Sequence, residues 1–173
     1  QCIDYSPDGI AWQSPPLSGA SSFPLNAFTI TGNTPFNGYW TMGIATYYSY
    51  LTGNWDNPNT WTFDPSGTTG PVTTFPSNND RVVILPGRTV SLTSDISSTN
   101  LQITINASGT LDLSTYRYTN IITNLAGQGM LRLASVNFPT ATTNTFINTG
   151  GGTTEYYNSV NFTLPITQAT YNH

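Results

Sequence analysis

The chain has 173 residues, a formal net charge of −4 at pH 7 and charged side chains at only 7% of its positions. A hydrophobic content of 37% and an aromatic content of 13% argue for one packed domain or two small ones over a disordered chain. The composition argues strongly against a nucleic-acid binder, because there is no lysine and the four arginines are scattered, whereas phosphate binding needs a clustered basic face.

The N-terminus begins with Gln1 followed by Cys2, the only cysteine. A start at Gln1 favours a mature N-terminus left after removal of a signal peptide. Cys2 cannot form an intrachain disulfide, which leaves a partner chain, a thiol adduct or a buried thiol. No apolar run has the length of a membrane span. We therefore expect a protein that is secreted or held at the cell surface.

Residues 1–75 are predicted to form an aromatic-rich N-terminal cap. All four tryptophans lie in this segment, prolines interrupt it often, and it has no steady period. Large aromatic side chains can cover the open end of a stack of repeats, which otherwise exposes core and strand edges. The alternative interpretation is a stacking platform for sugar rings, which makes Trp40, Trp55 and Trp61 candidate ligand-binding residues.

The turn between Trp55 and Trp61 is the one segment whose composition would suit a calcium ion. Asp56, Asn57 and Asn59 offer side-chain oxygens, a partial set of the ligands that calcium needs. Asn and Asp in turns more often bond their own backbone. We therefore predict no cofactor and no metal site, with calcium as the open alternative.

Residues 76–173 carry turn signals at nearly constant spacing. Gly87, Gly109, Gly129 and Gly151 follow one another at intervals of 22, 20 and 22 residues. Strand-like runs precede these turns at 82–85, 101–105, 120–123 and 145–148, and follow them at 89–92, 110–113, 130–133 and 154–157. Apolar and polar residues mostly alternate in these runs, so one face of each is expected to be buried.

A unit of this size cannot bury its own apolar face, but stacked copies can share a continuous core. The period therefore predicts an all-β, right-handed parallel β-helix (β-solenoid) with coils of about 20–25 residues. A β-sandwich is the competing fold, and it does not explain why both sets of strands keep step with the glycines. Residues 161–173 still have strand character, so we expect the coils to continue beyond His173.

One group of charged residues falls together on this alignment. Asp112 and Arg132 occupy equivalent outward positions on neighbouring coils, about 4.8 Å apart, whereas Glu155 is one residue out of phase unless a bulge shifts the register. We interpret the group as a surface ion pair of small energetic value. The alternative is a pair of carboxylates that cleaves polysaccharides. No catalytic motif accompanies them, so no catalytic residue is predicted.

The segment Gly53-Asn54-Trp55 with Trp61, followed by the run from Pro76 to Val90 and by Gly109-Thr110-Leu111, resembles β-solenoid modules of large secreted surface proteins of the Bacteroidetes. The similarity covers about residues 50–165. It implies export by the type IX secretion system and kinship with gliding adhesins of the SprB type. It also implies that Trp55 and Trp61 pack the first coil and that Asp80 caps the turn into Val82. Arg81 departs from the pattern, where a second acidic residue is frequent, and this weakens any metal site at that turn.

We therefore expect a non-catalytic leading domain of a cell-surface adhesin or filament, active in adhesion or gliding motility. Its partners would be secretion or cell-surface proteins and, in some cases, glycans, with no nucleic acid and no membrane-spanning segment. The first alternative is a carbohydrate-binding module that uses exposed aromatic rings. The second is a polysaccharide lyase or hydrolase built on a β-helix.

Overall fold

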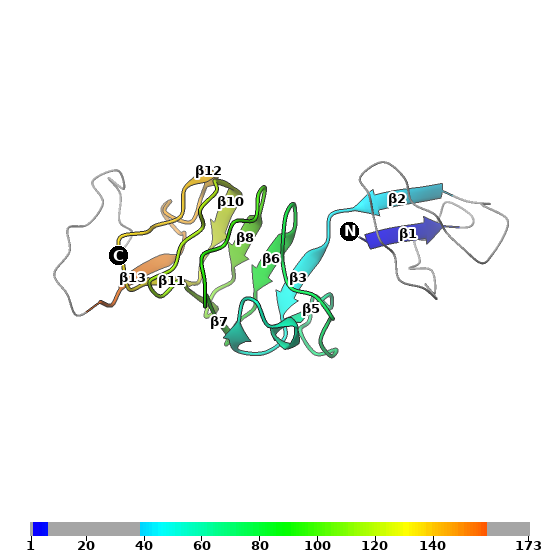
Figure 1. The fold of residues 1–173 in the computed structure, drawn as a ribbon, viewed down its shortest axis with the longest axis horizontal. Helices are drawn as coiled ribbons and strands as arrows, with labels where there is room; N and C mark the ends of the chain where they lie inside the picture. Colours follow the sequence, from blue (N-terminus) through cyan, green and yellow to red (C-terminus); the bar gives the residue numbers. More distant parts are fainter. Residues whose placement is uncertain (1, 7–38, 159–173) are drawn as a thin grey trace. The chain divides into compact units, whose positions relative to one another are not determined.

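The computed structural model describes residues 2–6 and 39–158 (Figure 1). The chain divides into two compact units, Gln1–Ile44 and Ala45–His173. In the first unit, β1 (Cys2–Ser6) pairs antiparallel with β2 (Tyr39–Gly43). The predicted boundary at residue 75 differs from this division, because residues 45–75 make their contacts with the strands that follow them.

The second unit is a parallel β-solenoid of about 4 turns, which confirms the predicted fold class (Figure 1). Each turn supplies one strand to each of two sheets, and the first turn adds β5 to the first sheet. The first sheet contains β3 (Thr46–Ser49), β5 (Trp61–Thr62), β6 (Arg81–Ile84), β8 (Gln102–Ile105), β10 (Ile122–Gly127) and β12 (Ala141–Asn144). The second contains β4 (Gly53–Asn54), β7 (Thr89–Ser91), β9 (Thr110–Asp112), β11 (Met130–Leu133) and β13 (Thr153–Tyr156).

Apolar ladders run through the inside of this stack. Val90 lies opposite Leu111 and Leu111 opposite Leu131 in the second sheet, and all three side chains are completely buried. In the first sheet, Val82 pairs with Ile103. Like residues therefore stack directly above one another, so each coil provides the apolar surface that its neighbour needs to bury. This is the physical reason for the period in the sequence.

The strands of the second sheet lie within one residue of their predicted positions, but the last coil differs in two ways. The strand predicted at 145–148 is β12, four residues earlier, because Phe146 is fully buried in the turn that follows β12. In the second sheet, Thr154 lies opposite Leu131, so β13 begins one residue before the predicted run 154–157. The turn containing three consecutive glycines lengthens this coil to 23 residues between paired positions.

The first coil is longer, with 37 residues between the paired Gly53 and Val90. The additional length contains the 3-10 helix η1 (Pro58–Thr60) and β5, which folds back antiparallel against β3 at the edge of the first sheet. Among the described residues no helix is long and apolar enough to cross a membrane.

Asparagine side chains connect the coils at a third corner. The Asn100 side-chain amide donates to Asn79 Oδ1 at 2.9 Å, and both residues have positive φ angles, 57° and 65°. The Thr99 backbone N–H donates to Asn78 Oδ1 at 2.8 Å. Asn tolerates this left-handed backbone better than most residues. These contacts repeat the coil period at a corner that the glycine spacing did not mark.

Glycine is required where the backbones of successive coils meet. Gly127 has a φ of +113°, and a Cβ atom there would lie 2.0 Å from the Ile105 carbonyl oxygen of the preceding coil. Neither the backbone conformation nor the space accepts a side chain. Gly87 has a φ of +70° with no atom near its would-be Cβ, and Gly70 has neither restriction.

These three glycines make a graded test of coil stacking. We expect Gly127→Ala to lower the free energy of unfolding by about 3 kcal/mol or more, since backbone strain and overpacking add. Gly87→Ala should cost about 1–2 kcal/mol from its backbone conformation alone, and Gly70→Ala should be neutral or slightly stabilising. Urea denaturation of the three variants measures this order, and equal effects would contradict it.

Candidate functional site

The outer face of the second sheet holds the main cluster of charged side chains among the described residues. The register aligns Ser91, Asp112, Arg132 and Glu155 on β7, β9, β11 and β13. Asp112 and Arg132 are neighbours, as the sequence predicts. Glu155 lies directly opposite Arg132, so its predicted one-residue offset is wrong, because the longer last coil shifts the strand.

Arg132 lies at the centre of this cluster and bonds both carboxylates. Its Nε atom is 2.5 Å from Glu155 Oε2, and Nη1 is 3.1 Å from Asp112 Oδ2. Its guanidinium carbon lies 4.3 Å from the centroid of the Tyr157 ring, a cation–π contact. The cluster therefore joins three successive coils through one planar cation.

Asp112 is the most enclosed member, with 9% of its surface exposed. Tyr157 Oη donates to Asp112 Oδ1 at 3.0 Å, and the Ser114 backbone N–H donates to the same oxygen at 2.8 Å. Asp112 is thus covered by its neighbours, unlike the exposed pair expected from the sequence. A buried carboxylate with several donors contributes more than a surface ion pair does.

The pKa values of the two donors in the cluster, Arg132 and Tyr157, are both raised. The hydrogen bond to Glu155 raises the pKa of Arg132, against the effect of burial. Burial first, and then donation to Asp112, raises the pKa of Tyr157. Both groups therefore keep their protons near neutral pH. The guanidinium of Arg132 lies between the two carboxylates, whereas glycoside hydrolysis needs open space between such a pair.

Two further acidic residues, Asp64 and Asp80, are engaged in separate local turns. Asp64 accepts hydrogen bonds from the backbone N–H groups of Ser66, Thr68 and Thr69, at 2.9, 3.1 and 2.8 Å. The Ser66 hydroxyl donates to it as well, at 2.6 Å, and this bond is the largest cause of a lowered pKa at Asp64. Asp64 is therefore ionised, and its carboxylate holds the loop from Ser66 to Thr69 in place.

Asp80 closes the turn that leads into β6. It is 6% exposed, and the Ser77 backbone N–H donates to its Oδ2 atom at 2.8 Å. Burial raises the pKa of Asp80, and the hydrogen bonds from Ser77 act against that rise. The next residue, Arg81, is exposed on β6.

Two of the three residues considered for calcium use a side-chain oxygen elsewhere. Asp56 Oδ2 accepts from the Thr93 hydroxyl at 2.9 Å, and Asn57 Oδ1 accepts from the Asn59 backbone N–H at 3.0 Å, which caps η1. Residues 2–6 and 39–158 contain no group of three or more His, Cys, Asp or Glu side chains placed to hold a metal ion. Calcium binding at this turn stays an untested prediction.

The candidate sugar-binding tryptophans do not form an exposed platform. Trp55 and Trp61 are 1% and 0% exposed, and their rings meet edge to face with centroids 5.2 Å apart. The Trp61 indole N–H donates to the Trp55 carbonyl at 2.7 Å. Neither ring has a free face, so the ligand-binding prediction fails for this pair. Trp40 lies in β2, and its side chain is outside the part of the structure described.

Comparison with family models, with curated proteins and with solved structures gives no match for this chain. The chain is therefore classified by its fold alone, as a parallel β-solenoid with an ion-pair ladder on one face.

The Arg132 cluster predicts a measurable difference between two ion pairs. Arg132→Met should lower the free energy of unfolding by about 1–3 kcal/mol, because Asp112 stays enclosed without its cation. The matched control is Arg117→Met, since the Arg117–Asp95 pair is 3.5 Å long with side chains 59% and 46% exposed. That change should cost less than about 0.5 kcal/mol. Thermal and urea unfolding of both variants measure the two losses of stability. Similar losses would refute the distinction between the enclosed and the exposed ion pair.

The Asp64 loop predicts a pH dependence. Because folding lowers the pKa of Asp64, its carboxylate stabilises the fold at pH values above the unfolded pKa of about 3.9. That contribution is lost as the pH falls below this value. Asp64→Asn should therefore lower the melting temperature at pH 7 and have a smaller effect at pH 3. A constant difference at both pH values would count against this role.

Proposed function

We propose that this chain is a non-catalytic leading domain of a secreted, cell-surface adhesin or filament. Its role is to hold a binding surface away from the cell on a stiff scaffold. The observation that carries the proposal is the continuous stack from β3 to β12 and from β4 to β13, in which every strand pairs in parallel with the next coil. In such a stack each coil contacts only its neighbours, and the contacts between coils supply the stability of an elongated scaffold.

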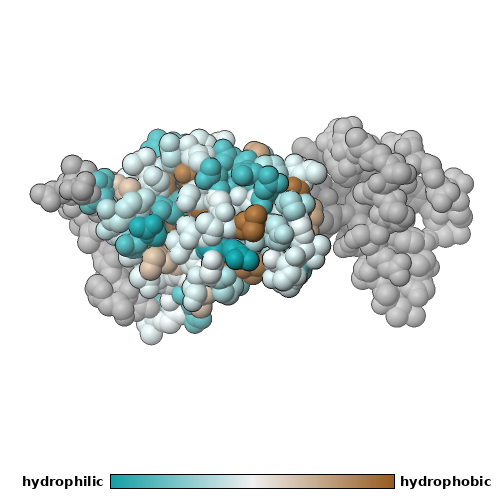
Figure 2. All heavy atoms as spheres, turned by 90° about the horizontal axis from the view of Figure 1, so that it is seen from below, coloured by the Kyte–Doolittle hydropathy of each residue, from teal (hydrophilic) through white to brown (hydrophobic). Residues whose placement is uncertain are grey.

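The surface of the solenoid supports the same proposal. Figure 2 shows the face of the solenoid that is seen from below in the orientation of Figure 1. Most residues on it are polar, with small and separate apolar spots. Neutral Thr, Ser, Asn and Gln side chains supply most of this polarity, since only 7% of the residues are charged. The two carboxylates that come together both bond Arg132, which ties coils to one another. The resemblance to Bacteroidetes surface modules favours the type IX secretion system as the export route.

The carbohydrate-binding alternative through Trp55 and Trp61 is not carried forward, because both rings are enclosed. The enzyme alternative through Asp112 and Glu155 loses its support from geometry, since Arg132 lies between the two carboxylates.

Location and adhesion test the proposed function. Antibodies raised against residues 45–158 should label intact cells of the organism that encodes the chain, and protease treatment of those cells should remove the label. Beads coated with the full chain should stay attached, under flow, to the surfaces that these cells colonise. Beads coated with heat-unfolded chain are the control.

Two results would refute the proposal. The first is an antigen that antibodies reach only after cell lysis. The second is turnover of a polysaccharide by the purified chain, with loss of turnover in Asp112→Asn.

A further inference from the structure

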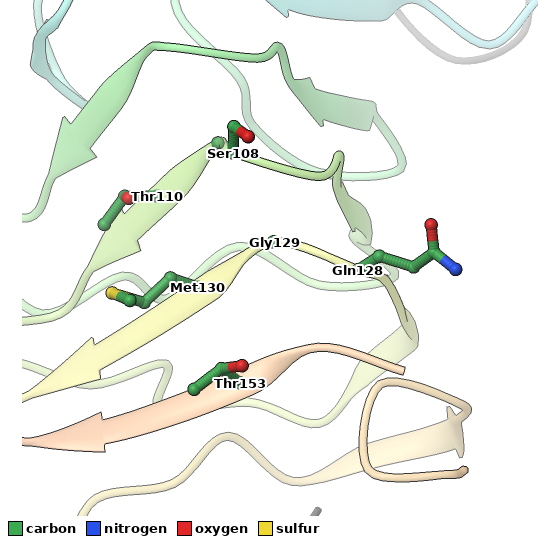
Figure 3. Close-up of a pocket in the computed structure, with 7 residues that line it drawn as sticks. Ser108, Thr110, Gln128, Gly129, Met130 and Thr153 are labelled. Carbon is green, nitrogen blue, oxygen red and sulfur yellow. The ribbon is translucent and has the colours of Figure 1, made fainter. Parts of the chain in front are cut away.

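An open groove of about 300 Å³ lies at the corner where the chain enters the second sheet (Figure 3). It crosses three successive coils, because its lining comes from β9, β11 and β13 and from the turns before the first two of these strands. Its lining residues are Ser108, Gly109, Thr110, Gln128, Gly129, Met130 and Thr153. Neither the Arg132 cluster nor the tryptophans contribute to it.

Glycine forms the corners that line the groove because the backbones of successive coils come close together there. A Cβ atom on Gly129 would lie 2.4 Å from the Asn106 carbonyl oxygen, and one on Gly109 would lie 2.9 Å from the Ile84 carbonyl oxygen. Side chains are therefore excluded from these two corners, and the coils can stack closely beside the groove. The hollow is thus built into the stacking of the coils and does not depend on a flexible loop.

The lining of the groove is neutral. Ser108, Thr110 and Thr153 provide hydroxyl groups, which both donate and accept hydrogen bonds. Met130 provides an adaptable apolar surface in the middle strand. No charged residue lines the groove, and the nearby Arg132 is already bonded to two carboxylates. A hydroxylated neutral ligand would therefore find matching hydrogen-bond partners along this lining.

The groove also has a repeat. Thr110, Met130 and Thr153 lie opposite one another on neighbouring strands, and Figure 3 shows their side chains one below the other. Parallel strands are about 4.8 Å apart, so similar contacts recur at that interval along the stacking axis. A linear polymer with a similar repeat can make one weak contact per coil, and the contacts add along its length. Gln128 stands at the edge of the groove, where its side-chain amide donates to the Gly150 carbonyl at 3.2 Å.

We propose that this groove binds a neutral linear polysaccharide that runs along the solenoid axis. The inference rests on the proposed function, because it identifies the surface that an adhesive module would use and the chemical class of its ligand.

Calorimetric titration of the full chain with β-1,4- and β-1,3-linked glucan oligosaccharides, from dimer to hexamer, tests the proposal. We expect affinity to rise with length until the ligand spans the three coils. Met130→Glu should weaken binding about tenfold or more, because it places an unpaired charge in the groove. The second variant, Thr153→Ala, removes one hydroxyl and should weaken binding less than Met130→Glu does. The matched control is Thr104→Glu, an outward position in the middle of β8 on the other sheet, which should leave affinity unchanged.

The outcomes separate this inference from the proposed function. Binding that Met130→Glu and Thr104→Glu weaken equally would overturn the assignment of the groove. So would equal affinity for polyuronates. If coated beads adhere but no glucan binds or competes, the groove proposal fails and the adhesive function stands. If neither the label nor the beads are found at surfaces, the adhesive function fails, and glucan binding lost in Met130→Glu would then support the groove by itself.

Discussion

Close stacking of successive coils, at the spacing of parallel strands, is the constraint on which the rest of this structure depends. It requires that like residues lie above one another, so Val90, Leu111 and Leu131 form one buried ladder. It requires glycine where the backbones of two coils meet, as at Gly127. It also brings outward side chains from neighbouring coils within bonding distance, which is how Arg132 comes to bond two carboxylates. Core, corners and surface are three results of the same repeat.

The regular coils could be predicted from sequence because each contributes the same short signal, an alternating strand followed by a glycine corner. The last coil could not, because its spacing alone does not distinguish Phe146 in a strand from Phe146 buried in a turn. The first coil has no copy to align with. Its β5 folds back antiparallel against β3, and no period in the sequence indicates that contact. Burial of Trp55 and Trp61 follows from this fold-back, so the sequence left both the cap and the sugar platform open.

The charged cluster was partly predictable for the same reason. Asp112 and Arg132 lie in two coils of nearly equal length, so counting residues places them side by side. Glu155 follows a longer turn, and counting places it one position away from its true partner. The contact of Tyr157 with Arg132 depends on the direction of a side chain beyond the last strand, which sequence spacing does not contain. The groove was not predicted because its lining comes from three coils, and the spacing of Gly109 and Gly129 indicates turns without showing what lies beside them.

The antiparallel strand β5 has a consequence for the order in which the coils fold. Because β5 occupies the outer edge of β3, the first sheet can grow in one direction only, toward β6 and the later coils. Each later strand finds its partner about twenty residues earlier in the chain, so contacts form between segments that are close in sequence. Folding can therefore proceed from the N-terminal side of the solenoid, with each coil completed on its predecessor.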